Sequence, residues 1–233
     1  MTEKLYEGAA FIAGPTASGK SAAALMLAEK IGAEIVNADA LQVYADLDIL
    51  SARPSPDDLA RAPHHLYGFL DAAAACSAGL WARKAAAVIA DVNRRGRPAI
   101  VVGGTGLYFR ALEEGLSPIP AVADAVRSET RARFERLGPE AFRTDLLKVD
   151  PQAAAIAPGD TQRLLRAGEV YAATGRPFSA FRAEARAPLI LPARARIVVE
   201  PPRNALYAAC DARFGHMLAR GGLRAERPRR PPG

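Results

Sequence analysis

The sequence predicts an α/β protein in which a parallel sheet is flanked by helices and a helical insertion interrupts the chain. Three observations support this fold class. A glycine-rich turn at residues 14–21 joins a short apolar run to a helical stretch. Two further short apolar runs each lead into a polar or glycine-rich turn, as buried parallel strands do. Between Pro118 and about Pro188 such runs are absent and helical patterns with charged faces take over.

The first strand, turn and helix come in an informative order. Ala9–Ala13 is a short apolar run, as expected of a buried strand. Ser21–Ile31 carries Ala, Leu and Met at helical spacing, and Gly32 is a typical C-terminal stop. The turn between them reads Gly14-Pro15-Thr16-Ala17-Ser18-Gly19-Lys20-Ser21, which fits the pattern G-x-x-x-x-G-K-[ST]. This is a phosphate-binding loop, so we predict a P-loop NTPase-like sheet.

Such a loop has a physical mechanism for holding phosphate. Glycines allow successive backbone N–H groups to turn inward, and the following helix points its positive end at the same anion. Lys20 adds a point charge, and the Ser21 hydroxyl is placed to ligate Mg²⁺. We therefore expect all eight loop residues to bind either a nucleotide such as ATP or a diphosphate, with Mg²⁺ as cofactor.

The elements after the first helix continue the α/β pattern. We expect strands at Ala33–Val36 and Pro98–Val102, a proline-rich loop at Leu50–Pro63, and helices at Trp81–Asn93 and Leu107–Leu112. Asp39 follows the second strand, and Gly103-Gly104-Thr105-Gly106 follows the third, so both segments lie where open α/β sheets bind ligands. No Asp ends the third strand to hold Mg²⁺, which argues against an ordinary nucleotide-hydrolysing motor.

The helical insertion has clear breakpoints. These are Gly138-Pro139, Asp150-Pro151, Pro158-Gly159 and Gly175-Arg176-Pro177. Asp160 is a candidate N-cap for the helix that begins around Gln162–Ala167, where Arg163 and Arg166 share one face. A strand at Ala195–Glu200 and a helix at Arg203–Arg220 return to the sheet. We expect a core at 1–117, an insertion at 118–189, a return segment at 190–233, and a disordered tail at Arg227–Gly233.

Composition excludes several classes of protein. The chain has 233 residues, of which 50% are hydrophobic, so it can bury a substantial core. No apolar run approaches the ~20 residues of a membrane span, and the N-terminal residues lack a signal-peptide pattern. Cys76 and Cys210 are too few and too far apart for a zinc site or a disulfide framework. We expect a cytoplasmic protein, and nothing indicates more than a monomer.

The charge is unevenly distributed along the chain. Its net value is +6, but residues 1–120 carry 11 basic and 13 acidic side chains, whereas residues 121–233 carry 20 basic and 12 acidic ones. A phosphate-binding core followed by a basic half suggests that the second half holds a polyanionic partner. A solvated surface in an arginine- and alanine-rich sequence explains the charge equally well.

Several motifs occur in an order that resembles one family. After the phosphate loop come Asp39-x-x-Gln42-Val43-Tyr44, Pro63-His64-His65-Leu66, Gly103-Gly104-Thr105-Gly106-Leu107-Tyr108, Asp150-Pro151, Asp160-x-Gln162-Arg163-x-x-Arg166-Ala167-x-Glu169-Val170 and Thr174-Gly175. From about Phe11 to Leu223 this ordered set resembles the tRNA dimethylallyltransferases, also called tRNA isopentenyltransferases. The phosphate loop alone is shared by many families, whereas the ordered set is much more specific.

The resemblance implies a reaction and its participants. A dimethylallyl group would pass from dimethylallyl diphosphate to N6 of the tRNA adenine just 3′ of the anticodon, and diphosphate would leave. The loop would then hold a prenyl diphosphate, with Lys20 and Mg²⁺ on Ser21 stabilising the leaving group. Asp39 would be the general base, and Thr105 would hydrogen-bond near the leaving group or the adenine. The target base would have to leave its stack to reach the pocket.

The same resemblance implies the residues that contact tRNA. Near the reaction these are Asp39, Ala40, Leu41, Gln42 and Thr105, with Gln42 reading the edge of a base. In the insertion they are Arg127, Gln162, Arg163, Leu164, Leu165 and Arg166.

Two features depart from the family pattern. Ala40 stands where the family usually has Ser after the Asp, and the family's further C-terminal helices are missing, which predicts a C-terminally truncated member. Three other functions remain open: a P-loop small-molecule kinase, an adenylate dimethylallyltransferase of the cytokinin type, and a tRNA-binding remnant without turnover. The motif around Asp39 argues against the kinase, and the helical insertion favours tRNA over free adenylate.

The individual residues also have plainer explanations. Asp39 and Thr105 are residue types that cap turns and bond locally, and the three insertion arginines are also consistent with ordinary surface charges. His64 and His65 are adjacent and lack a carboxylate cluster, so we expect a structural loop there rather than a metal site.

Overall fold

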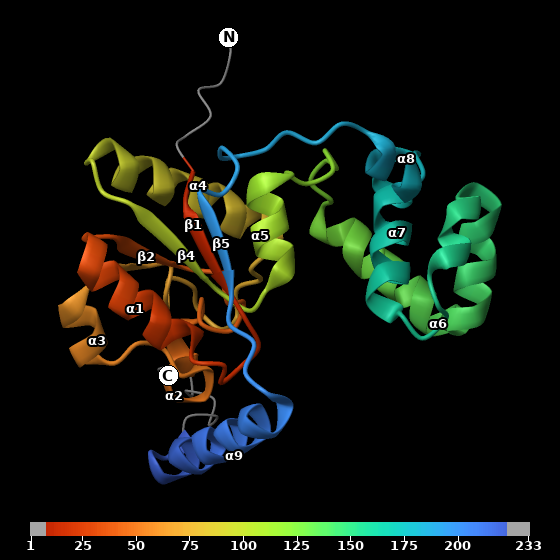
Figure 1. Cartoon of the computed structure of the whole chain (residues 1–233). Coiled ribbons are helices and arrows are strands. Elements are labelled where there is room, and N and C mark those ends of the chain that lie inside the picture. The colour runs from red at the N-terminus through yellow and green to blue at the C-terminus, as the bar shows by residue number, and fades with distance from the viewer. Residues whose placement is uncertain (1–7, 223–233) are drawn as a thin grey trace, which may run out of the picture. The chain divides into compact units, whose positions relative to one another are not determined.

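The computed structural model describes residues 8–222 and contains a five-stranded, all-parallel sheet (Figure 1). The strand order is β3-β2-β4-β1-β5. The strands are β1 (Ala10–Ala13), β2 (Glu34–Asn37), β3 (His64–His65), β4 (Ala99–Gly103) and β5 (Ala195–Val198). The predicted α/β class, parallel sheet and flanking helices are confirmed.

Helices cover both faces of this sheet. One face is covered by α1 (Lys20–Ile31), next to α3 (Pro56–Arg61), and the other by α4 (Ala78–Arg94) and α5 (Gly106–Glu113). The same unit also contains η1 (Ala45–Leu47), α2 (Asp48–Ser51) and α9 (Arg203–Ala219). Because side chains alternate along a strand, Ile12, Ile35 and Ile100 pack against α1. Phe11, Val36 and Val101 lie in the other core cluster, with α4 and α5. This double burial explains why the strands read as continuous apolar runs.

The segment Leu50–Pro63 is not the simple loop that its prolines predict. It contains α3, which begins with a capping box in which the Ser55 side chain accepts a hydrogen bond from the Asp58 backbone and the Asp58 side chain accepts one from the Ser55 N–H. Pro56 occupies the first turn, where proline is well tolerated. The expectation of a loop with turns is therefore wrong over Pro56–Arg61, where the Ser-Pro-x-Asp pattern was the signal for a helix.

The pair His64-His65 also differs from the expected loop. It forms the short strand β3, which pairs in parallel with Ile35 and Val36 of β2. His65 Nε2 lies 2.7 Å from a carboxylate oxygen of Glu34. No group of three His, Cys, Asp or Glu side chains that could hold a metal occurs among residues 8–222.

Residues 116–187 form a compact helical unit, and the rest of the described chain forms a second unit around the sheet. The helical unit contains α6 (Asp124–Val149), η2 (Pro151–Ala155), α7 (Thr161–Thr174) and α8 (Phe178–Ala183). Gly138, with φ of 75°, and Pro139 kink α6, and the Asp160 side chain caps α7, as predicted. Phe142, Leu146 and Leu164 form part of its core. The predicted disordered tail, Arg227–Gly233, lies outside the described residues.

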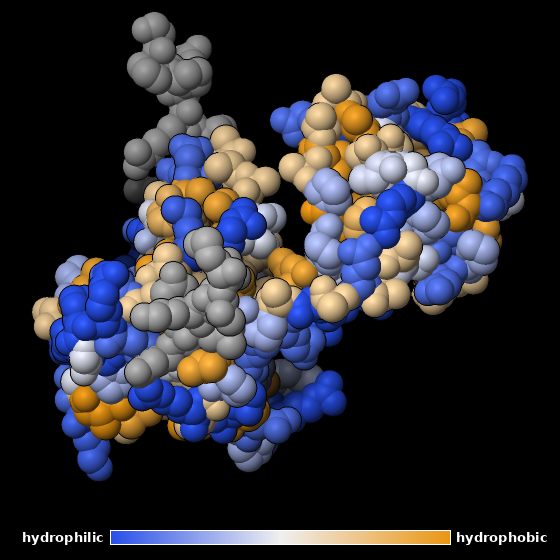
Figure 2. Space-filling model, turned by 90° about the horizontal axis from the view of Figure 1, so that it is seen from above, coloured by the Kyte–Doolittle hydropathy of each residue, from blue (hydrophilic) through white to orange (hydrophobic). Residues whose placement is uncertain are grey.

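The face seen in Figure 2 mixes hydrophilic and hydrophobic residues, and the strongly hydrophobic ones are scattered over it. Within residues 8–222, no helix combines the length and apolarity that crossing a membrane requires.

Glu34 carries a buried charge at the amino end of β2. Its side chain is 1% exposed and pairs with Arg95, Arg97 and His65. Hydrogen bonding to Arg95, opposed by burial and assisted by His65, lowers the pKa of Glu34 to about 2. The paired carboxylate thereby joins the start of β2 to β3 and to the end of α4.

We predict that Glu34→Gln lowers the free energy of unfolding by about 2 kcal/mol at pH 7, because charged hydrogen bonds are lost. Since the folded pKa lies below the ordinary value of about 4.3, the stabilisation is complete above that value and is lost as the pH falls toward 2. Urea unfolding at several pH values checks this. The gap between wild type and variant should narrow below pH ~4, and a constant gap would contradict it. Asp211→Asn, at an exposed position of α9, is the control.

Candidate active site

The phosphate loop joins β1 to α1 with two left-handed residues. Ala17 has φ of 62° and Gly19 has φ of 86°, and Gly19 is the N-cap of α1. A left-handed alanine is strained, which is common at ligand-binding turns. The first turn of α1 contains no acidic side chain, so its N–H groups and positive dipole end have no local carboxylate to neutralise them. This geometry is suited to holding an anion.

The loop also presses closely against the end of β5. A Cβ atom added to Gly14 would lie 2.6 Å from the Val199 carbonyl oxygen and 2.8 Å from Ser18 Oγ. Only glycine fits there without a shift. Ser18 Oγ is buried and has no hydrogen-bond partner among the described residues. A buried hydroxyl without a partner is costly, so this atom is suited to meet a ligand oxygen.

Lys20 turns its ammonium group back onto the loop. Its Nζ donates a 2.9 Å hydrogen bond to the Pro15 carbonyl, and the residue is 8% exposed. Burial lowers the pKa of Lys20, the negative charge of Asp39 opposes that shift, and the positive charge of Arg213 adds to it. The carboxylate after β2 and an arginine of α9 are therefore both close enough to influence the loop lysine.

Arg213 was not marked as a site residue by the sequence. It lies on α9, and its guanidinium donates a 3.3 Å hydrogen bond to the Ser51 carbonyl. Cys210, one turn earlier, has its Sγ 3.9 Å from the Thr16 carbonyl oxygen. These contacts place α9 beside the phosphate loop, although the two segments are far apart in the sequence. No local pattern in the sequence reports such a contact.

Asp39 follows β2 and is held by its own turn. Its Oδ1 accepts a 2.9 Å hydrogen bond from the Leu41 N–H, and its own N–H donates to Asn37 Oδ1 at 2.9 Å. The residue is half-buried. The carboxylate thus keeps one oxygen without a protein partner in the described structure.

Thr105 and Gly103 fasten the end of β4 to this turn. The Thr105 N–H donates to the Ala38 carbonyl at 3.1 Å, and Thr105 Oγ1 accepts the Ala40 N–H at 3.0 Å. A Cβ on Gly103 would lie 2.1 Å from the Ala38 carbonyl oxygen. Glycine is therefore required for the two strand ends to approach. The fold brings Asp39 and Thr105 together at one edge of the sheet, as their places after β2 and β4 predicted.

The other predicted residues of this turn have different surroundings. Gln42 uses its amide N–H groups to bind the Ser51 and Ala52 carbonyls at 3.0 and 2.9 Å. Those donors hold α2 in place. Leu41 is 59% exposed, whereas Ala40 is half-buried against the core cluster.

The predicted tRNA-contact residues of the insertion lie mostly on α7. Gln162 and Arg163 are exposed, while Leu165 and Arg166 are half-buried. Arg163 pairs with Asp160, Arg166 with Glu169, and Arg127 of α6 with Asp124. Leu164 corrects one prediction: it is 0% exposed in the core of the unit, so its side chain packs the helix and presents no surface to tRNA.

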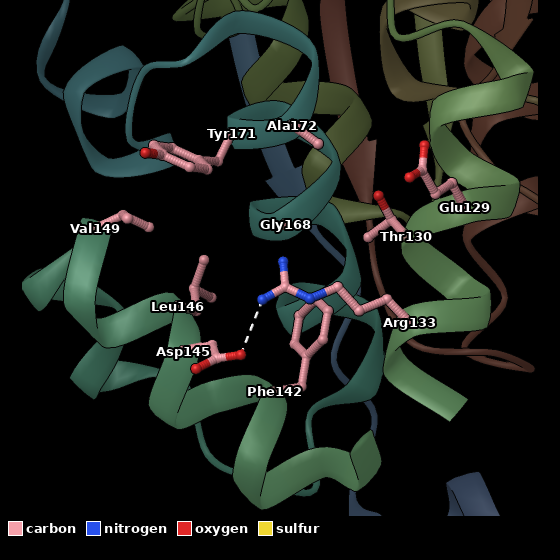
Figure 3. A pocket seen from close by; sticks show the side chains of 10 residues that line it. All are labelled: Glu129, Thr130, Arg133, Phe142, Asp145, Leu146, Val149, Gly168, Tyr171 and Ala172. Atoms are coloured by element: carbon pink, nitrogen blue, oxygen red, sulfur yellow. Dashed lines mark hydrogen bonds and ion pairs between the residues drawn. The ribbon is translucent and has the colours of Figure 1, made fainter. Parts of the chain in front are cut away.

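The helical unit also contains a cavity of about 370 Å³ (Figure 3). Phe142 and Leu146 from the second half of α6 and Tyr171 from α7 line its apolar part. Arg133 donates a 2.9 Å hydrogen bond to Asp145 and thereby joins the two halves of the kinked α6. A Cβ on Gly168 would lie 2.6 Å from the Phe142 ring, so this glycine lets α7 pack closely there.

Comparison with known proteins identifies the family. The model of the IPP transferase family matches residues 42–226. A tRNA dimethylallyltransferase of Phenylobacterium zucineum is 59% identical over 213 residues, which are 91% of this chain and 69% of that protein. The chain belongs to the tRNA dimethylallyltransferase family. A member from Parvibaculum lavamentivorans is 53% identical over 216 residues, 92% of this chain and 68% of that one. Enzymes of this family transfer a dimethylallyl group to an adenine of tRNA.

Solved structures of tRNA dimethylallyltransferases share the fold. A eukaryotic dimethylallyltransferase crystallised while acting on tRNA has a TM-score of 0.79 and 28% identity, covering 94% of this chain and 55% of that chain. The full-length tRNA isopentenylpyrophosphate transferase of Bacillus halodurans has a TM-score of 0.60 and 29% identity, covering 94% and 68%. The chain thus spans just over half of the eukaryotic relative and about two thirds of the bacterial ones.

We predict that Gly103→Ala lowers the free energy of unfolding by about 2–3 kcal/mol, because its methyl group would overlap the fixed backbone of Ala38. Gly106→Ala is the matched control, since a Cβ there meets nothing within 4 Å. Urea unfolding of both variants checks the difference. Equal stability of the two would show that the strand ends separate easily, which contradicts the close approach.

Proposed function

We propose that this chain transfers the dimethylallyl group of dimethylallyl diphosphate to N6 of the tRNA adenine 3′-adjacent to the anticodon. The observation that carries the proposal is the pairing of an anion-binding loop with a single carboxylate. Lys20 and the partnerless Ser18 hydroxyl belong to the loop, and Asp39 lies within electrostatic range of Lys20. Transfer to an amine requires both parts: a site for the diphosphate and a base for the proton.

The diphosphate end of the substrate fits the loop formed by Gly14–Ser21. As the bond from the first prenyl carbon to oxygen breaks, negative charge gathers on the leaving diphosphate. The N–H groups at the start of α1, the Ser18 hydroxyl and the Lys20 ammonium group are positioned to stabilise that charge. Arg213 contributes a second positive charge near Lys20.

The donor set near the loop suits a magnesium ion bound chiefly through the substrate. Ser21 offers an exposed hydroxyl at the start of α1, and Mg²⁺ commonly takes few protein ligands together with phosphate oxygens and water. Ser21 would hold the ion, which would neutralise charge on the diphosphate.

Asp39 is the proposed general base. The adenine amine is a weak nucleophile because its lone pair is delocalised into the ring, so its proton must leave as the new bond forms. In the balanced step, the N6–carbon bond forms, the carbon–oxygen bond breaks, the proton passes to Asp39, and diphosphate departs. Thr105 Oγ1 accepts the Ala40 N–H, which leaves its own hydroxyl hydrogen free to donate to the leaving group or the adenine.

tRNA would contact both units. Ala40, Leu41 and Gln42 border the proposed base, and Arg127, Gln162, Arg163, Leu165 and Arg166 offer polar and basic side chains on the helical unit. The arginines pair only with exposed or half-buried carboxylates of their own helices, which RNA phosphates can replace at small cost. We further propose a monomer acting in the cytoplasm, where the free thiols of Cys76 and Cys210 would stay reduced.

We predict that Asp39→Asn lowers kcat for tRNA prenylation about 10²-fold or more, with the KM for dimethylallyl diphosphate nearly unchanged, because proton removal is lost while the loop is intact. Asp57→Asn, an exposed carboxylate of α3, is the control. The transfer of label from dimethylallyl diphosphate to an anticodon stem-loop measures kcat and KM for each variant. The same assay is run in parallel with AMP as the acceptor. Transfer to AMP but not to RNA would contradict the proposed substrate.

We predict that Arg163→Ala and Arg166→Ala together raise the KM for tRNA several-fold and reduce its dependence on salt, because phosphate contacts are lost. Binding of dimethylallyl diphosphate should not change. Arg182→Ala, at an exposed position of α8 in the same unit, is the matched control. An equal effect of Arg182→Ala would show that only the total charge of the unit matters.

A further inference from the structure

The side chain of Asn37 lies at the centre of the active-site edge of the sheet. Asn37 is the last residue of β2, is 0% exposed, and stands two positions before Asp39. Its Oδ1 accepts the Asp39 N–H at 2.9 Å, while its Nδ2 donates to the Asp39 carbonyl at 3.0 Å and to the Leu66 carbonyl at 3.1 Å. The carboxamide therefore grips the main chain of Asp39 on both sides.

We propose that Asn37 is a positioning residue for the transfer reaction: its carboxamide clamps the main chain of Asp39 to the Leu66 turn and so fixes the direction of the Asp39 carboxylate. This inference rests on the proposed role of Asp39 as the base. Both Asn37 donors are used, so Asn37 has no N–H left for a substrate and acts only through Asp39.

The main chain of Asn37 is itself held by a residue of the hydrophobic core. The Asn37 carbonyl accepts a 2.8 Å hydrogen bond from the Trp81 indole N–H. Trp81 is itself 0% exposed and stacks on Tyr108 with ring centroids 4.1 Å apart. A residue fixed by such a partner cannot shift without disturbing the core, so its side chain is a rigid support for the next turn.

The clamp also gives a role to the motif Pro63-His64-His65-Leu66. Pairing of β3 with β2 brings the chain alongside Asn37, and Leu66 then takes a left-handed conformation with φ of 62°. Such a conformation is strained for a residue that is not glycine. It turns the Leu66 carbonyl to the Asn37 amide, which offsets part of that strain.

On its other side the turn is held by Thr105, whose Oγ1 accepts the Ala40 N–H. Two consecutive peptide units, those of Asp39 and Ala40, are thereby fixed by side chains from two different strand ends. A base misplaced by about 1 Å can lose roughly 10²-fold in rate. The carboxylate of this half-buried residue needs such support, because its side chain has one hydrogen bond within the described structure, which Oδ1 accepts from the Leu41 N–H in the same turn.

Asn37→Ala tests the proposal by a double-mutant cycle with Asp39→Asn. We expect Asn37→Ala to lower kcat about 10–100-fold while the KM values for dimethylallyl diphosphate and tRNA change less than about twofold. Added to Asp39→Asn, it should have almost no further effect, because there is no base left to position. The proposal would be overturned if the two substitutions lowered kcat independently, so that the loss in the double variant equalled the product of the two single losses. A rise in KM without a loss of kcat in Asn37→Ala would overturn it as well.

A second measurement does not depend on turnover. Hydrogen exchange of the Asp39 amide should be faster in Asn37→Ala than in wild type, and unchanged exchange would overturn the clamp even in an inactive chain. Trp81 is the sole tryptophan, so its emission reports whether the variant is folded. If Asn37→Ala unfolds, Asn37→Ser takes its place in both measurements, with the same expected results.

These experiments distinguish a failure of the proposed base, Asp39, from a failure of the positioning role of Asn37. A small effect of Asp39→Asn in an active enzyme would defeat the proposed base and this inference together. A large effect of Asp39→Asn with independent losses from Asn37→Ala would defeat only the positioning role.

Discussion

The close approach of β4 to the end of β2 is the constraint on which the site depends. Gly103 lets its strand pass so near Ala38 that no side chain fits between them. That approach brings Thr105 within reach of the Ala38 carbonyl and the Ala40 N–H. With the turn held there, the Asp39 carboxylate stands close enough to the phosphate loop to influence Lys20. The lack of a Cβ atom at Gly103 thus sets the spacing between the proposed base, Asp39, and the phosphate loop.

Local signals of the sequence were sufficient for the loop, the sheet and the helical insertion, because glycine spacing and apolar periodicity act over a few residues. The sequence missed β3, whose two residues become a strand only by pairing with β2. The prolines of the segment Leu50–Pro63 predicted a loop, so α3 was missed, although its capping box is a local signal. Tertiary packing, which a linear pattern does not encode, decides three further placements. It puts Leu164 in a core, Arg213 near Lys20 and the Asn37 side chain against the main chain of Asp39.

Tertiary contacts also explain how the turn tolerates Ala40, which stands where the family usually has a serine. Its N–H is already bound by Thr105 Oγ1, and its methyl group packs against the core cluster around Trp81. The backbone of this position is thus fixed without a hydroxyl of its own. Gln42 has a comparable structural role two residues later, where its amide holds the carbonyls of Ser51 and Ala52. Ala40 and Gln42 of the motif around Asp39 therefore both have structural roles in this turn.

The outer strand of the sheet has a consequence for how the protein behaves at high concentration. Within residues 8–222, β5 pairs with β1 alone, and all four of its residues are exposed, including Ile197 at 42% and Val198 at 67%. A strand edge with apolar side chains is a template on which another chain can add. Arg196, which pairs with Glu113, places a charge on this edge and so limits such growth. Protection of this edge against aggregation therefore depends on a single charged residue of the strand.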